Sequence, residues 1–157
     1  MGSEMCIRDR NGISDWHLAV AGGGPLRNNL ASLTQKLGLG DRVSFLGVRN
    51  DIPDLLSAAD LFVLSSAWEG FPMVVGEAMA CECLVVATDC GGVREFLGDS
   101  EFLVEPNNSE ALAAAINDAL QLTDDQRAAY GRFARERVQE LYSLDVTVDK
   151  WLAIYKG

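Results

Sequence analysis

Residues 61–97 read LFVLSSAWEGFPMVVGEAMACECLVVATDCGGVREFL, and this stretch decides the fold. Its two apolar runs, Leu61–Leu64 and Leu84–Ala87, do not alternate with polar residues, which indicates strands buried on both faces. Between them, Pro72–Ala80 suits a helix with proline in its first turn. A buried strand, a helix and a second buried strand predict parallel strands joined by a crossover helix.

The same alternation continues on both sides of this stretch. Upstream, a strand is predicted at Trp16–Ala21 and another at Val43–Leu46. Between them, leucines recur at helical spacing, and Gly38 and Gly40 end this helix. Downstream, Phe102–Val104 is a last short strand. Further helices are predicted at Asp51–Ala59, Ser109–Leu120 and Thr123–Leu141, with a final one that carries Trp151 and Tyr155 on one face. We therefore expect an α/β protein with a doubly wound parallel sheet.

Composition narrows the class of protein. The chain has 157 residues, of which 48% are hydrophobic and 23% charged, as in one globular domain. Its 13 Lys and Arg against 23 Asp and Glu give a net charge of −10, which argues against nucleic acid as a partner. The apolar runs are far shorter than the roughly 20 residues that span a bilayer. Four cysteines without a recognisable secretory leader predict reduced thiols and a cytoplasmic location.

The first ten residues, MGSEMCIRDR, show neither strand nor helix periodicity. We expect residues 1–10 to be a leader, tag or junction outside the fold. The folded domain is then expected at residues 11–157.

Three loops at the carboxyl ends of predicted strands could bind a ligand, because ligands of open α/β sheets bind there. The first contains Gly23 and Gly24, which would let backbone N–H groups approach a phosphate. The dinucleotide fingerprint needs another glycine where Arg27 stands, which disfavours a nicotinamide or flavin cofactor. A tight turn without a ligand is the alternative for this loop.

The second loop is the richest, because Glu69 lies in it and Glu77 lies just inside the next helix. Ionised carboxylates accept hydrogen bonds from sugar or ribose hydroxyls. The helix start between them would offer free N–H groups to an anion at Phe71, Pro72, Met73 and Val74. Each glutamate alone could equally be a solvated surface charge. The third loop adds Gly91 and Gly92 for close backbone approach, and Glu95 in the first turn of a short helix.

Residues 68–97 resemble the donor-binding segment of retaining glycosyltransferases of family 4, which have the GT-B architecture. The hallmark is a glutamate, seven residues and a second glutamate, here Glu69 and Glu77. The resemblance extends to LAVAGGGPLRNNL and VSFLGVRNDIPDLLSAADLFVLSS, and covers roughly residues 13–155. It implies a Rossmann-like C-terminal domain that binds a nucleotide-sugar donor.

The resemblance also implies a role for each matching position. Glu77 would hold the ribose hydroxyls, and Glu69 would contact the transferred sugar as the catalytic position. The Phe71–Val74 backbone would help hold the diphosphate or the sugar. The remaining donor-binding positions would be Gly23, Gly24, Gly47, Val48, Gly91, Gly92 and Glu95. Such transferases usually need no metal and no cofactor beyond the donor substrate, and we expect none.

Two departures from the family matter. The family's first strand of this domain, with a Gly-Arg pair and a following Lys-Gly that grip the diphosphate, has no match. In a sheet of order 3-2-1-4-5-6 this strand is central, and its loss would leave backbone groups of its neighbours unpaired. The N-terminal acceptor domain has no match either. We therefore expect a C-terminal fragment that is inactive alone, with membrane contact made mainly by the absent half.

Other functions stay open at this point. The alternatives are a non-catalytic nucleotide-binding or interaction module descended from such a domain, and a GT-B nucleotide-sugar epimerase. His17 is expected to be a strand histidine rather than a catalytic one. Cys81, Cys83 and Cys90 lack zinc-site spacing and are expected to serve packing.

Overall fold

The computed structural model describes residues 4–9 and 16–156. They form a six-stranded sheet in the order β3-β2-β1-β4-β5-β6. The strands are β1 (Glu4–Asp9), β2 (Trp16–Ala21), β3 (Val43–Gly47), β4 (Leu61–Leu64), β5 (Leu84–Thr88) and β6 (Leu103–Val104). The helices are α1 (Arg27–Lys36), α2 (Ile52–Ala58), α3 (Met73–Ala80), α4 (Val93–Leu97), α5 (Ser109–Leu120), α6 (Asp124–Tyr142) and α7 (Leu144–Lys156).

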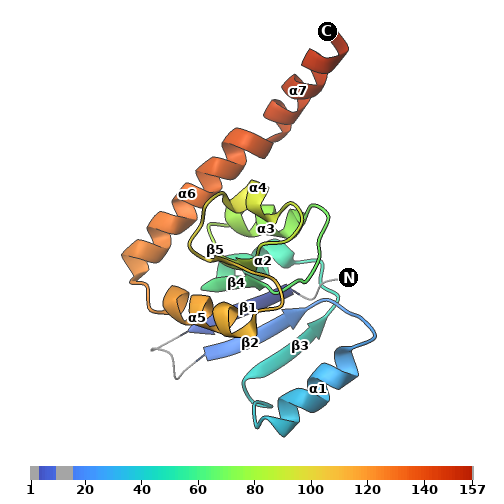
Figure 1. The fold of residues 1–157 in the computed structure, drawn as a ribbon, viewed down its shortest axis with the longest axis vertical. Coiled ribbons are helices and arrows are strands. Elements are labelled where there is room, and N and C mark those ends of the chain that lie inside the picture. Colours follow the sequence, from blue (N-terminus) through green and yellow to red (C-terminus); the bar gives the residue numbers. More distant parts are fainter. Residues whose placement is uncertain (1–3, 10–15, 157) are drawn as a thin grey trace.

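The buried strands β4 and β5 separate two hydrophobic cores. They pair in parallel, with Leu61 opposite Leu84 and Leu64 opposite Ala87. Because alternate side chains point to opposite faces, Phe62 enters one core and Val63 the other. Helices cover both faces, with α2, α3 and α4 on one side and α5 on the other (Figure 1). This arrangement explains why neither run alternates, and it confirms the predicted doubly wound α/β fold.

The N-terminal segment differs from our expectation. We expected residues 1–10 to lie outside the fold, but Glu4–Asp9 forms β1 in the centre of the sheet (Figure 1). There it supplies backbone partners to β2 and β4, whose facing edges would otherwise be unpaired. Residues 1–3 and 10–15 lie outside the described part of the chain.

The direction of β1 is the second difference. β1 runs antiparallel to both neighbours, whereas β2–β3, β4–β5 and β5–β6 are parallel. A parallel central strand would need a crossover connection of about a dozen residues or more before β2. The connection from Asp9 to Trp16 is shorter than that, so it permits an antiparallel pair only.

Two apolar helix faces that the sequence predicts are not covered. The α1 leucines have the expected helical spacing, yet α1 contains no buried residue, and Leu26 and Leu37 are each 62% exposed. At the other end, α7 continues beyond the sheet after α6 (Figure 1). Its large apolar side chains, including Trp151, Ile154 and Tyr155, are exposed. Helix periodicity therefore located both apolar faces but not a partner for either.

Candidate functional site

The loops after β2 and β3 meet at the carboxyl edge of the sheet. The Gly22 N–H donates a hydrogen bond of 2.7 Å to the Gly47 carbonyl. A Cβ placed on Gly23 would lie 3.6 Å from Cγ2 of Val48, which is 82% exposed. A Cβ on Gly24 would meet no described atom within 4 Å. The structure thus brings Gly23 and Val48 together, and it leaves the backbone beside them open to a ligand.

The loops after β4 and β5 are packed against each other more tightly. The Gly92 N–H donates a hydrogen bond of 2.8 Å to the Gly70 carbonyl. Gly91 has a φ of +53°, and a Cβ there would lie 2.0 Å from the Glu69 carbonyl oxygen. A side chain at Gly91 is therefore excluded by contact as well as by backbone conformation. The two glycines fix the main chain of the loop that carries Glu69.

The Glu69 side chain is half-buried and held in one direction. The Ser66 hydroxyl donates a hydrogen bond of 2.6 Å to Oε1 of Glu69. A carboxylate oxygen has more than one acceptor position, so Oε2 and a lone pair of Oε1 remain for a ligand. Our sequence analysis assigned Ser66 no role. The S-x-x-E spacing was the signal that could have identified it.

The start of α3 offers backbone donors next to Glu69. Pro72 is the N-cap residue and makes no side-chain capping bond, and its carbonyl accepts from the Val75 N–H at 3.0 Å. The first N–H groups of a helix lack intrahelical acceptors, so those of Met73 and Val74 can bind an anion. Glu77 follows on the same helix and is exposed. The pair of carboxylates thus flanks a helix N-terminus, as the sequence predicts.

The side chain of Phe71 points elsewhere. Its ring lies 4.5 Å from the Phe96 ring and 5.9 Å from the Tyr142 ring, centroid to centroid. This aromatic cluster anchors the α3 start against α4 and α6. Phe71 can serve a ligand through its backbone, while its ring has a packing role.

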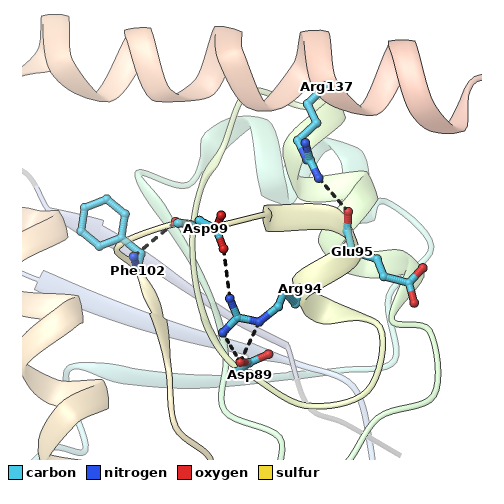
Figure 2. A network of polar contacts seen from close by, with 7 residues as sticks. Asp89, Arg94, Glu95, Asp99, Phe102 and Arg137 are labelled. Carbon is cyan, nitrogen blue, oxygen red and sulfur yellow. Dashed lines mark hydrogen bonds and ion pairs between the residues drawn. The ribbon is translucent and has the colours of Figure 1, made fainter.

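Glu95 lies in α4, and its contacts use the main chain. Its carbonyl accepts hydrogen bonds from Nη2 of Arg137 at 3.1 Å and from the Tyr142 hydroxyl at 3.0 Å. Its carboxylate is exposed, and Figure 2 shows it pointing away from Arg137. Burial, with the nearby Glu95 charge, raises the pKa of Tyr142, so this hydroxyl remains a hydrogen-bond donor at neutral pH. The structure leaves the Glu95 carboxylate available but gives it no contact with Glu69 or Glu77.

Three arginines near these loops are engaged with other groups. Arg94 pairs with Asp89 and, at 3.3 Å, with Asp99 (Figure 2). The hydrogen bond and charge of Asp89 raise the pKa of Arg94. Arg49 pairs with Asp51, and the guanidinium of Arg27 lies 5.9 Å from the Phe45 ring centroid. The backbone donors of α3 therefore offer positive potential that is not already neutralised by a carboxylate.

Other kinds of site were sought in residues 4–9 and 16–156. No cluster of three or more His, Cys, Asp and Glu side chains there could hold a metal ion. The same residues include no helix with the length and apolar character that crossing a bilayer requires. A cavity of about 490 Å³ lies away from the predicted site, between β5, the α4–β6 loop and α6.

Comparisons with known proteins agree with this geometry. Residues 7–137 match the family described as "Glycosyl transferases group 1". A lipopolysaccharide core biosynthesis mannosyltransferase, LpsB of Rhizobium meliloti, is 39% identical over 151 residues, which are 91% of this chain and 43% of that protein. An undecaprenol-linked N-acetylgalactosaminyltransferase of Campylobacter jejuni is 33% identical over 139 residues, covering 87% and 38%. The chain thus spans about two fifths of these curated relatives.

Solved structures show the same relationship. Alr3699/HepE of Anabaena, crystallised with UDP and glucose, superposes with a TM-score of 0.76 and 33% identity, covering 87% of this chain and 39% of that one. A glycosyltransferase from Rickettsia africae gives a TM-score of 0.81 at 31% identity, covering 88% and 38%. With its alternating strands and helices, the chain belongs to the group 1 glycosyl transferases, as a Rossmann-like domain of the GT-B C-terminal type.

Proposed function

We propose that this chain is the donor-binding half of a retaining glycosyltransferase, which transfers a sugar from a nucleotide-diphosphate sugar to an acceptor. The observation that supports this most is the α3 N-terminus, which lies between half-buried Glu69 and exposed Glu77. In this proposal Glu77 accepts hydrogen bonds from the ribose hydroxyls. Glu69 accepts them from the transferred sugar.

The rest of the site binds the nucleotide and the diphosphate. The free N–H groups of Met73 and Val74 donate to the diphosphate, and Gly91 and Gly92 bring the neighbouring loop close. Gly23, Gly24, Gly47 and Val48 line the nucleotide. As the sugar–diphosphate bond breaks, negative charge grows on the leaving diphosphate, and the positive end of α3 stabilises it. Glu69 orients the sugar in this scheme and is not assigned as a nucleophile.

Transfer itself requires a second domain that binds the acceptor. The chain covers 38–43% of the relatives described above, which leaves room in such proteins for another domain. The uncovered apolar side chains of α7 are consistent with packing against that domain. Cys81, Cys83 and Cys90 are free thiols, as in a reducing cytoplasm. Nucleic acid is not a proposed partner.

Thermal melting of the chain with UDP-glucose, GDP-mannose and ADP-glucose tests donor binding. One of these should raise the melting temperature, since ligand at a hundred times its Kd stabilises the native state by about 2.7 kcal/mol. Glu77→Ala should abolish that rise. Glu136→Ala, which removes an exposed glutamate from α6, should leave it unchanged. A cooperative melt that no nucleotide-sugar moves would refute the proposal.

A non-catalytic nucleotide-binding or interaction module is the second candidate. It is favoured by the ion pairs of Arg49 and Arg94, which leave those cations less available to a diphosphate. The two candidates differ in sugar dependence. A donor-binding domain should distinguish UDP-glucose from UDP, whereas a module that reads only the nucleotide should bind both equally.

A further inference from the structure

We infer that Ser66 is the positioning residue for Glu69, and that Thr88 holds Ser66 in place from the neighbouring strand. This inference rests on the proposed function, because it assigns Glu69 to the sugar. It adds residues outside the glutamate pair whose role is to select one direction of the Glu69 carboxylate.

The first step is the Ser66–Glu69 contact itself. At 2.6 Å, the hydroxyl-to-carboxylate distance is that of a charge-assisted hydrogen bond. A glutamate side chain has three rotatable bonds, and a solvated one samples many rotamers. The Ser66 hydroxyl favours the rotamer in which Oε1 faces the protein. Oε2 then remains for a sugar hydroxyl.

The second step is the anchoring of Ser66. The Thr88 hydroxyl, at the end of β5, lies 2.5 Å from the Ser66 carbonyl oxygen and 3.3 Å from that of Leu64. The Cys90 thiol lies 3.4 Å from the same Ser66 oxygen. Thr88 is only 3% exposed, and Cys90 8%. Buried hydrogen bonds of this kind fix the backbone from which the Ser66 hydroxyl projects.

The third step is the opposite end of the loop. Gly92 hydrogen-bonds the Gly70 carbonyl, and Gly91 lies directly against the Glu69 carbonyl. The main chain of Glu69 is thus fixed from both sides by residues that follow β5. Its side-chain torsions remain, and among the described contacts the Ser66 hydroxyl is the one that restricts them. Ser66 therefore acts on the sugar subsite and not on the nucleotide subsite.

Calorimetric titration of the whole chain with UDP and with UDP-glucose tests this inference. The measured quantity is the preference ratio, Kd for UDP divided by Kd for UDP-glucose. Ser66→Ala should lower this ratio about tenfold, the lower end expected for losing a hydrogen bond to a charged group. Its Kd for UDP should not change. Ser66→Thr keeps the hydroxyl and should restore the ratio, and Ser65→Ala, at an exposed neighbour, is the matched control.

Each other outcome overturns a defined part of the argument. If Ser66→Ala keeps the ratio, or weakens UDP and UDP-glucose equally, Ser66 has no positioning role. If the parent chain binds both ligands equally, donor-nucleotide binding stands, but Glu69 contributes nothing for Ser66 to direct and the inference is wrong. If the parent binds neither, the proposed function fails, and the inference fails with it.

Discussion

Replacing Gly91 by alanine tests whether the loop after β5 fixes the Glu69 loop. At Gly91 the backbone has a φ of +53°, a region that costs a residue with a Cβ about 1–2 kcal/mol. The new Cβ would also lie 2.0 Å from the Glu69 carbonyl oxygen, against a practical minimum of 3.0 Å. That oxygen must therefore move by at least the difference, 1.0 Å. Such overpacking adds about 1–3 kcal/mol.

The expected loss of unfolding free energy is then about 2–5 kcal/mol, the sum of the two contributions. For a chain of this size each kcal/mol lowers the melting temperature by roughly 2–4 °C, so a loss of about 3 kcal/mol gives roughly 6–12 °C. Circular dichroism melts measure this shift. UDP-glucose titration at a temperature where both proteins are folded measures the effect on the site. Binding should weaken, because the displaced carbonyl belongs to Glu69.

Gly38→Ala is the matched control. Gly38 has a φ of +69°, but a Cβ there would meet no described atom within 4 Å. It therefore reports the backbone cost without the steric contact, and it should lose about 1–2 kcal/mol. If Gly91→Ala and Gly38→Ala destabilise the chain equally, the contact with Glu69 contributes nothing. The argument that Gly91 is required by close packing would then be refuted.

Three further substitutions test the fold around the site. Thr88→Val removes a buried hydroxyl that lies 2.5 Å from a loop carbonyl, and it should cost about 1–3 kcal/mol in urea denaturation. Thr34→Val removes an exposed helix hydroxyl and should cost much less; equal losses would contradict the buried role. Thr123→Ala breaks the capping box of α6 and should cost about 1 kcal/mol, seen as faster amide exchange in the first turn. Gly131→Ala places a Cβ 2.3 Å from the Glu82 carbonyl oxygen, where α6 packs on the end of α3. It should lower the urea midpoint by about 1–3 kcal/mol equivalents, and an unchanged midpoint would show that the helices can separate at no cost.

Local sequence determined the elements and the glutamate pair. The Leu61–Leu64 and Leu84–Ala87 runs identified buried parallel strands because each residue faces one of two cores. Pro72 marked the start of α3, since proline needs no N–H partner there. The spacing of Glu69 and Glu77 placed one carboxylate in the loop and one on the helix. Patterns of this kind depend on near neighbours in the chain, so they can be interpreted without knowing the fold.

Partners distant in the chain were not predictable in the same way. Residues 4–9 have no strand periodicity, yet they occupy the central position because β2 and β4 need backbone partners there. The α1 leucines are spaced as a buried face, but only the three-dimensional arrangement shows that nothing among the described residues covers them.

The same distinction holds inside the candidate site. The sequence by itself determined that carboxylates, glycines and a helix start follow the strands, because residue type and spacing are local properties. Only the tertiary structure decided that Thr88 and Gly91, more than 20 positions away from Ser66 and Glu69, hold that loop. Parallel pairing of β4 with β5 brings the two strand ends together, and that pairing is a long-range interaction that spacing along one chain segment does not encode.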